Sequence, residues 1–201
     1  MKINIGKTEL IHFVGIGGIG MSGLALIMDS LGFKIQGSDK SDNKNLNLLR
    51  KRKIPIYLNH NKQNIKNCTV LVVSSAIKKS NPEYRHAKKL NLPIYKRGEL
   101  LGHIVSLMKN IVVTGSHGKT TTTSILSNIM NYAKLDPTII NGGVLNSIGS
   151  SAKLGKSDWS LVESDESDGS FLQIPFNYSI ITNIDNEHLD YYRTMKNLKN
   201  K

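Results

Sequence analysis

The residues Gly115, Gly118 and Lys119 form a pattern that suits the binding of a nucleotide triphosphate. They follow the short apolar run Ile111–Val113 and precede a row of threonines that opens a helical pattern. In such a turn the backbone N–H groups and the helix N-terminus point at the phosphates, a lysine adds positive charge, and the first threonine hydroxyl can reach a Mg²⁺. Two residues separate the glycines, where the common phosphate loop has four. The predicted ATP-type loop comprises Gly115, Ser116, His117, Gly118, Lys119, Thr120 and Thr121, with Lys119 as a catalytic residue.

An acidic stretch directly follows the apolar run Trp159–Val162. Glu163 stands at the end of this predicted strand, where a carboxylate can help to hold the Mg²⁺ of the phosphate-loop site. For the acids that come next on the expected loop, Asp168 above all, a solvated acidic turn is the alternative. Thr120 and Glu163 are therefore the first predicted metal ligands.

A third polar loop follows the predicted strand Tyr178–Thr182 and contains His188. Neutral imidazole can bind a metal or position a phosphate. A single loop histidine usually does neither, but this one follows a strand of the same predicted sheet edge. His188 is therefore a predicted catalytic and metal-binding residue. Histidines without a comparable context are interpreted as core or surface residues: His12, His60, His86 and His103.

A glycine-rich turn, Gly15–Gly20, lies between the first apolar run and a helical pattern. Its glycines permit a tight turn and a close backbone approach to a diphosphate, and Asp39 stands where a ribose-binding acid often falls. The third fingerprint glycine comes one residue early, which counts against a nicotinamide or flavin cofactor and leaves open a purely structural turn. The predicted diphosphate-binding residues are Gly15, Ile16, Gly17, Gly18, Ile19, Gly20 and Asp39.

Two further stretches are candidates for ligand contact. Val73–Ile77 ends a strand beside the expected crevice and contributes Ser74. Asn141–Gly149 is predicted to be a Gly/Asn-rich loop suited to close backbone contact with a ligand, and it contributes Asn146. Either stretch could be ordinary turn chemistry.

Composition limits the class of protein. The single cysteine, Cys68, cannot form an internal disulfide, and we expect a cytoplasmic protein without a signal peptide or membrane-inserted segment. The net charge of +12 could indicate nucleic acid. It comes mostly from scattered lysines, without an aromatic-interleaved basic helix, so we interpret it as a solvated surface and expect no nucleic-acid partner.

Strand-like and helix-like patterns alternate along the chain, which predicts an α/β protein with parallel sheets. We expect a Rossmann-like domain over residues 1–108 and a P-loop-type α/β domain over residues 109–201, with Lys109-Asn110 at the junction. The second domain has too few elements to close around its site, so the chain reads as a fragment.

Taken together, five stretches resemble the motifs of the Mur ligases of peptidoglycan synthesis, in the order of that family. They are Gly15–Ala25, Thr114–Thr122, Asn141–Gly149, Glu163–Phe171 and Thr182–Asp190. Ser116 stands where the family commonly has threonine, and Asn186-Glu187 stands where a small residue and Asp are more usual.

The resemblance implies an N-terminal domain that binds a UDP-sugar, to which Ser74 and Asn146 would contribute, and a central domain that binds ATP. It implies ATP and Mg²⁺ as cofactors, with His188 at a second metal or γ-phosphate site. The branch resembled most joins L-alanine to UDP-N-acetylmuramate through an acyl phosphate. A C-terminal domain that helps to bind ATP and the amino acid has no counterpart here, so we expect this chain alone to be inactive.

Three other functions compete with this expectation. A muropeptide-recycling ligase acts on the same sugar, but its first glycine loop is differently composed. An oxidoreductase would leave Lys119 without a role. Folate-polyglutamating ligases have a similar central phosphate-binding loop, but the N-terminal domain of UDP-sugar type argues against them. A non-catalytic nucleotide-binding fragment is the remaining interpretation.

Overall fold

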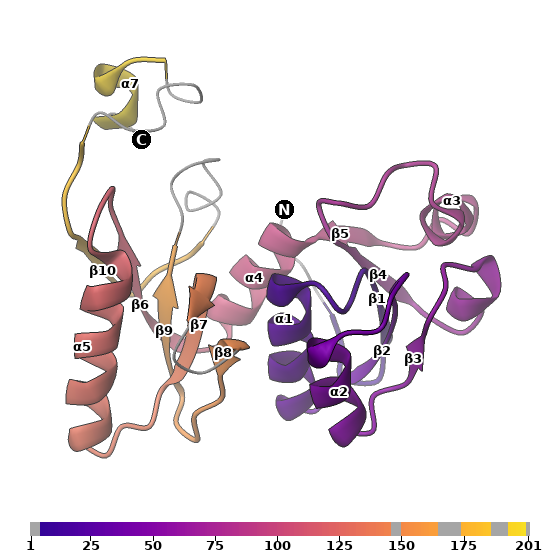
Figure 1. Ribbon diagram of the computed structural model, residues 1–201, viewed down its shortest axis with the longest axis horizontal. Helices are drawn as coiled ribbons and strands as arrows, with labels where there is room; N and C mark the ends of the chain where they lie inside the picture. Colours follow the sequence, from indigo (N-terminus) through magenta and orange to yellow (C-terminus); the bar gives the residue numbers. More distant parts are fainter. Residues whose placement is uncertain (1–4, 146–149, 165–173, 186–192, 200–201) are drawn as a thin grey trace. The chain divides into compact units, whose positions relative to one another are not determined.

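A mainly parallel β-sheet organises each half of the chain in the computed structural model, which describes residues 5–145, 150–164, 174–185 and 193–199 (Figure 1). Residues 1–100 and 101–201 form two compact units. The helix α4, Arg97–Ser106, runs across this division. No helix in the described part of the chain is long and apolar enough to cross a membrane.

The first unit contains a five-stranded parallel sheet with the order β3-β2-β1-β4-β5. Its strands are β1 Leu10–Val14, β2 Lys34–Ser38, β3 Ile56–Tyr57, β4 Val70–Val73 and β5 Ile94–Lys96; its helices are α1 Ile19–Ser30, α2 Lys44–Lys51, the 3-10 helix η1 Lys62–Ile65, and α3 Pro82–Lys89. From β1 the chain first builds outward to β2 and β3, then crosses to β4 on the other side. The carboxyl ends of β1 and β4 thus flank a topological switch point, where ligands bind in open α/β sheets.

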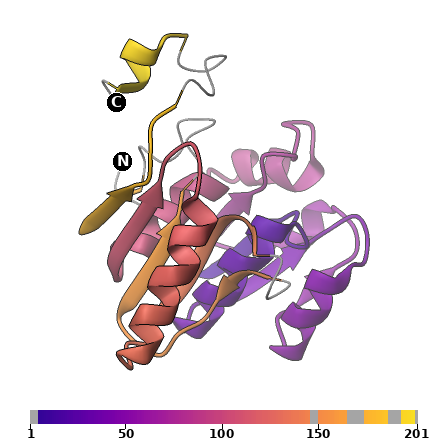
Figure 2. The same cartoon turned by 60° about the vertical axis from the view of Figure 1, so that its left-hand side comes forward.

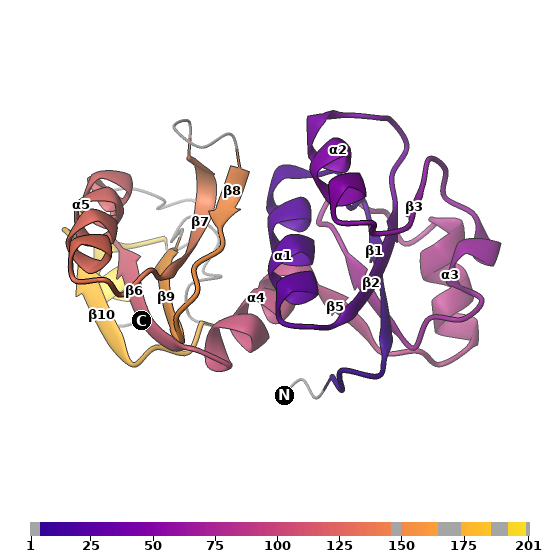
Figure 3. The ribbon, with the colours of Figure 1, turned by 90° about the horizontal axis from the view of Figure 1, so that it is seen from below.

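The core of this unit lies on both faces of the central strands. β4 is a continuous apolar run with all four residues buried, as expected for a parallel strand covered on both sides. Figure 3 shows α1 and α2 on one face of the sheet and α3 on the other. Burying a side chain such as Phe13 or Leu71, both fully inaccessible, contributes about 1.5–3 kcal/mol each to folding.

The second unit has a sheet with the order β10-β6-β9-β7-β8. The strands are β6 Lys109–Thr114, β7 Thr138–Leu145, β8 Ser150–Lys153, β9 Trp159–Glu163 and β10 Tyr178–Ile181; the helices are α5 Lys119–Tyr132 and the short α7 Met195–Lys199. β6 lies between β9 and β10 and is parallel to both. The helix α5 covers one face of this sheet (Figure 2). The carboxyl ends of β6, β9 and β10 therefore lie at one sheet edge.

One sequence prediction requires correction. Asn141 to Leu145, predicted as loop, continue β7, because this segment pairs with β8 and β9. The other strand pairs of this sheet are parallel, as expected for an α/β protein, and β8 adds an antiparallel edge strand next to β7. β6 begins at Lys109, and its first two residues, Lys109 and Asn110, pair with Trp159 and Ser160.

Candidate functional site

The turn between β6 and α5 has the backbone shape of an anion-binding loop. Gly115 and Gly118 have φ angles of +128° and +78°, which side chains rarely tolerate. A Cβ on Gly115 would also collide with the Thr182 side chain and lie 2.7 Å from the Asn183 carbonyl oxygen. The helix α5 starts at Lys119 with no side-chain cap and no acidic residue in its first turn. The positive end of this helix dipole therefore lies at the turn, where it favours an anion such as a phosphate.

The loop after β10 holds this turn in place. Asn183 accepts a hydrogen bond from His117 N at 2.9 Å, and its Nδ2 donates to His117 O at 2.9 Å. Thr182 Oγ1 also donates to His117 O, at 2.7 Å. Ser116 Oγ accepts from Asp185 N at 2.9 Å. This loop was expected at the same sheet edge as the phosphate loop, but the roles of Thr182 and Asn183 in shaping the turn were not predicted.

Lys119 lies over the carbonyl side of the turn. Its Nζ donates to Gly115 O at 2.5 Å and to Ser116 O at 3.3 Å. The ammonium group is therefore held at the turn, where it can offset the charge of a phosphate.

Glu163, at the carboxyl end of β9, meets Thr120 at the start of α5. Thr120 Oγ1 donates to Glu163 Oε1 at 2.9 Å. The carboxylate is buried, with the residue 7% exposed, and its Oε2 has no hydrogen-bond partner among the residues that the structure describes. A buried carboxylate oxygen without a partner costs free energy unless something binds it. A hydroxyl oxygen and a carboxylate oxygen that is free to bind a cation suit Mg²⁺. This ion usually takes only one or two protein ligands and fills its other positions with phosphate and water oxygens.

The described residues contain no group of three His, Cys, Asp or Glu that could hold a metal. His188, the third predicted metal ligand, lies outside the described residues, as do Asn146 and the acids at 165, 166 and 168.

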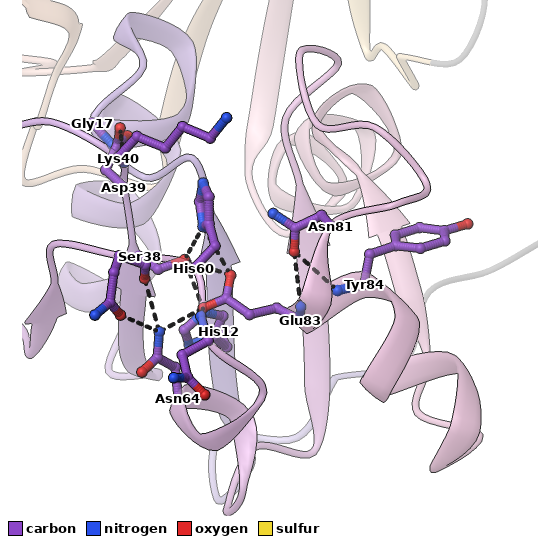
Figure 4. A network of polar contacts seen from close by, with 12 residues as sticks. His12, Gly17, Ser38, Asp39, Lys40, His60, Asn64, Asn81, Glu83 and Tyr84 are labelled. Carbon is purple, nitrogen blue, oxygen red and sulfur yellow. Dashed lines mark hydrogen bonds and ion pairs between the residues drawn. The ribbon is translucent and has the colours of Figure 1, made fainter.

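Hydrogen bonds to neighbouring residues of the first unit hold the glycine turn in its conformation. Gly15 N and Ile16 N donate to Ser38 O, and Gly17 N donates to Asp39 Oδ2 at 2.8 Å (Figure 4). Asp39, predicted as a ribose-binding acid, thus anchors the turn. Ile16 is fully buried, so its side chain belongs to the core rather than to a ligand surface. Gly18 precedes α1, so the positive end of this helix dipole lies at the glycine turn.

Arg97 and the start of α2 also surround this turn. A Cβ on Gly20 would lie 3.1 Å from Nη1 of Arg97, so the guanidinium group lies beside the first turn of α1. Asn45 Nδ2 donates to Gly17 O at 2.8 Å. Nothing in the local sequence indicated either contact, because Arg97 and Asn45 stand far from the turn along the chain.

A cavity of about 570 Å³ opens beside the turn. Apolar residues such as Leu58 and Ile77 line it together with Lys40, Lys78 and His60. It adjoins the switch point, because a Cβ on Gly15 would lie 3.2 Å from Cβ of Ser74 and 3.6 Å from Cδ1 of Ile77. A cavity that combines apolar side chains with polar groups and two lysines suits the base and the charged phosphates of a nucleotide.

Comparison with known families decides the parentage. Residues 10–109 match the Mur ligase family, catalytic domain, and residues 113–201 match the Mur ligase middle domain. The chain belongs to the Mur ligase family. Only residues 110–112, within β6, separate the two matches, so the first match contains the Gly15–Gly20 turn and the second contains the Gly115–Thr121 turn.

Curated Mur ligases resemble the chain over nearly its whole length. It is 66% identical over 199 residues to a UDP-N-acetylmuramate–L-alanine ligase of Pelagibacter ubique, covering 99% of this chain and 43% of that protein. It is 47% identical to the enzyme of that name from Brucella ovis, over 96% of this chain and 40% of the relative. The chain therefore spans about two fifths of the length of these relatives.

Solved Mur ligases share the fold. A UDP-N-acetylmuramate-alanine ligase of Thermotoga maritima superposes with a TM-score of 0.81 at 32% identity, over 96% of this chain and 45% of the other. A UDP-N-acetylmuramate:L-alanyl-γ-D-glutamyl-meso-diaminopimelate ligase of Neisseria meningitides gives 0.80 at 26% identity, over 96% and 65%.

Proposed function

We propose that this chain is the nucleotide-binding part of a UDP-N-acetylmuramate–L-alanine ligase. The observation that carries the proposal is the pairing of Thr120 with Glu163 beside the Lys119 turn, in a chain 66% identical to a ligase of that name. Identity to the recycling-type ligase of Neisseria is only 26%, so the alanine-adding reaction is the better supported of the two.

In this proposal the domain over residues 1–108 binds the UDP-sugar. The cavity supplies apolar walls for a base, while Lys40 and Lys78 supply positive charge. The positive end of α1 and the guanidinium group of Arg97 beside Gly20 offer a second anion contact for the diphosphate.

The domain over residues 109–201 binds ATP. Backbone N–H groups from Gly115 to Thr121 surround its phosphates, and Lys119 offsets charge on the transferred phosphoryl group. Thr120 and Glu163 would hold Mg²⁺, with His188 as a proposed further ligand. When bound, the metal supplies electrostatic stabilisation of the phosphate oxygens.

The ligase reaction in this proposal has two steps, formation of an acyl phosphate and formation of the amide. A muramic carboxylate oxygen attacks the γ-phosphorus, the bond to the bridging oxygen breaks, and ADP leaves with an acyl phosphate formed. The nitrogen of L-alanine attacks the acyl carbon, phosphate leaves with the electron pair of the C–O bond, and the amine loses a proton to give the amide. The residues described here contribute binding and charge stabilisation to the first step.

Both nucleotides and the buried thiol of Cys68 fit a protein of the cytoplasm. We expect the substrates to be its ligands, with no nucleic acid among its partners. Because the chain spans about two fifths of its curated relatives, we expect binding without turnover from these residues alone.

Calorimetric titration tests this proposal. Separate injections of UDP-N-acetylmuramate, of ATP with Mg²⁺ and of NADH are compared on the same folded sample. We expect the first two to bind and NADH not to bind. Binding of NADH without the UDP-sugar would contradict the proposal.

A further inference from the structure

A buried carboxylate, Glu83, lies at the centre of a polar network in the first unit (Figure 4). Asn81 caps α3 by accepting hydrogen bonds from the backbone N–H groups of Glu83 and Tyr84, which fixes Glu83 in the first helical turn. The Glu83 side chain is fully buried. Ser38 Oγ donates to its Oε2 at 2.6 Å, and Asn64 Nδ2 donates to its Oε1 at 2.7 Å.

These partners keep Glu83 ionised. Burial alone raises the pKa of a carboxyl group, but the hydrogen bonds from His12, Ser38 and Asn64 outweigh it and hold the pKa of Glu83 below its ordinary value. An ionised carboxylate only accepts hydrogen bonds, so any nitrogen bonded to it must carry a proton.

His12 is held in one tautomer by Gln36. Gln36 Nε2 donates to the backbone carbonyl of Asn64 at 2.7 Å, which orients the amide. The same nitrogen lies 3.1 Å from His12 Nδ1, so this Nδ1 accepts a hydrogen bond. The ring proton of neutral His12 is therefore on Nε2, which faces Ser38 Oγ at 3.4 Å and Glu83 Oε1 at 3.5 Å.

His60 is held in the opposite tautomer. Its Nδ1 lies 3.1 Å from Glu83 Oε2 and 3.0 Å from Ser38 Oγ. The Ser38 hydroxyl already donates its proton to Glu83. Ser38 Oγ and Glu83 Oε2 can therefore both accept a hydrogen bond from His60 Nδ1–H. Figure 4 shows the other end of the ring directed away from the network. His60 also lines the cavity beside the glycine turn.

We propose that Glu83 is a positioning residue: it fixes His60 as the Nδ1–H tautomer, so that Nε2 presents a hydrogen-bond acceptor to the cavity. In this arrangement the carboxylate binds one ring nitrogen of the histidine and thereby sets the protonation of the other, which contacts the ligand. The ligand group that the acceptor takes is an N–H donor of a nucleobase. If the ligand is the uridine nucleotide of the proposed function, on which this step rests, the donor is the N3–H of uracil. Cytosine has an unprotonated N3 in the same place, which is an acceptor and would not pair with His60 Nε2.

The tautomers can be measured directly by imidazole ¹⁵N NMR on the ligand-free 201-residue chain at pH 8. We expect His60 with its proton on Nδ1 and His12 with its proton on Nε2. A proton on Nε2 of His60 would overturn the proposal, and this result does not depend on any ligand or variant.

Glu83→Gln gives a sharper test. Oε1 of Glu83 accepts from Asn64 Nδ2 and from Asn61 N at 3.4 Å, so the amide oxygen of Gln belongs there. The amide nitrogen then occupies the Oε2 position and donates to His60 Nδ1. We expect the His60 proton to move to Nε2 while His12 is unchanged. An unchanged His60 tautomer in a folded variant contradicts the proposal.

The ligand readout compares UDP and CDP by calorimetry. We expect the wild-type chain to favour UDP and E83Q to lose about tenfold or more of that preference, because an acceptor becomes a donor. Glu99→Gln, on an exposed carboxylate of α4 without a histidine contact, serves as the control and keeps the wild-type ratio. Equal losses of UDP and CDP binding in E83Q would indicate a merely structural role. Failure of the wild-type chain to bind UDP would count against the proposed function and leave the tautomer result standing.

Discussion

Thr120 Oγ1 donates a hydrogen bond of 2.9 Å to Glu163 Oε1, while Oε2 of the same buried carboxylate accepts no hydrogen bond within the described part of the chain. The two residues come from the start of α5 and the end of β9, which are brought together because β6 and β9 pair in parallel. A hydroxyl, a carboxylate and an open oxygen beside a phosphate-type turn form the part of the molecule best suited to a metal-bound triphosphate.

Glu163→Gln should remove the Mg²⁺-dependent part of ATP binding. The neutral amide keeps the shape but offers the metal no charge, so we expect ATP affinity in Mg²⁺ to fall about 10- to 100-fold, as when an interaction with a charged group is lost. Calorimetry with and without Mg²⁺ measures this. Asp158→Asn, on an exposed carboxylate just before β9, is the control. An unchanged Mg²⁺ effect in E163Q would show that Glu163 is not a ligand.

Lys119→Met should weaken ATP binding and leave UDP-N-acetylmuramate binding intact. Methionine suits a helix start about as well as lysine, so α5 is expected to persist while the charge at the turn is lost. We expect at least about a tenfold loss of ATP affinity, the scale of one charge-assisted hydrogen bond. The exposed Lys156→Met is the matched change, and equal effects of the two variants would refute a specific role.

Gly37→Ala should destabilise the first unit. A Cβ there would lie 2.5 Å from Ile16 Cδ1 and 2.7 Å from the Phe13 carbonyl oxygen, and backbone cannot easily yield. We expect the free energy of unfolding to fall by about 1–3 kcal/mol, measured by urea denaturation. Gly6→Ala, where the nearest atoms would be 3.8 Å away, should change it little. Similar effects of both changes would mean that the packing at Gly37 is not decisive.

Glu83 should make the stability of the first unit depend on acid pH. Its pKa is lowered from an ordinary value of 4.5, so the ionised form is preferred in the folded state. The stabilisation is fully present above about pH 4.5 and is lost as the pH falls through the lower folded pKa. Urea denaturation from pH 7 to pH 3 should show the wild-type advantage over E83Q shrinking in that window. A constant difference across the range would contradict this.

Sequence patterns predicted the elements with strong local signals. The continuous apolar run of β4 and the glycine turns before α1 and α5 required no knowledge of distant residues, and each lies where it was expected. The short helix α2, capped by Asn43, was missed because it is eight residues long and mostly polar. The extension of β7 through Asn141-Gly142-Gly143 was missed because pairing with neighbouring strands overrides the low strand propensity of these residues.

The candidate site shows the same division. The position of Glu163 at a strand end was readable, and so was its proximity to the phosphate turn. The contacts of Asp39 and Glu83 were not, because each depends on partners more than twenty residues away that no local period reveals. His60 carries no motif of its own, and only the fold places it between a buried carboxylate and a cavity.

The most direct test of the two-site account is an NMR titration of the ¹⁵N-labelled chain with each nucleotide in turn. UDP-N-acetylmuramate should shift the amide signals of Gly15 to Gly20 and of His60, and ATP with Mg²⁺ should shift those of Gly115 to Thr121 and of Glu163. Shifts confined to the opposite unit for either ligand, or none from UDP-N-acetylmuramate in a folded sample, would contradict the account.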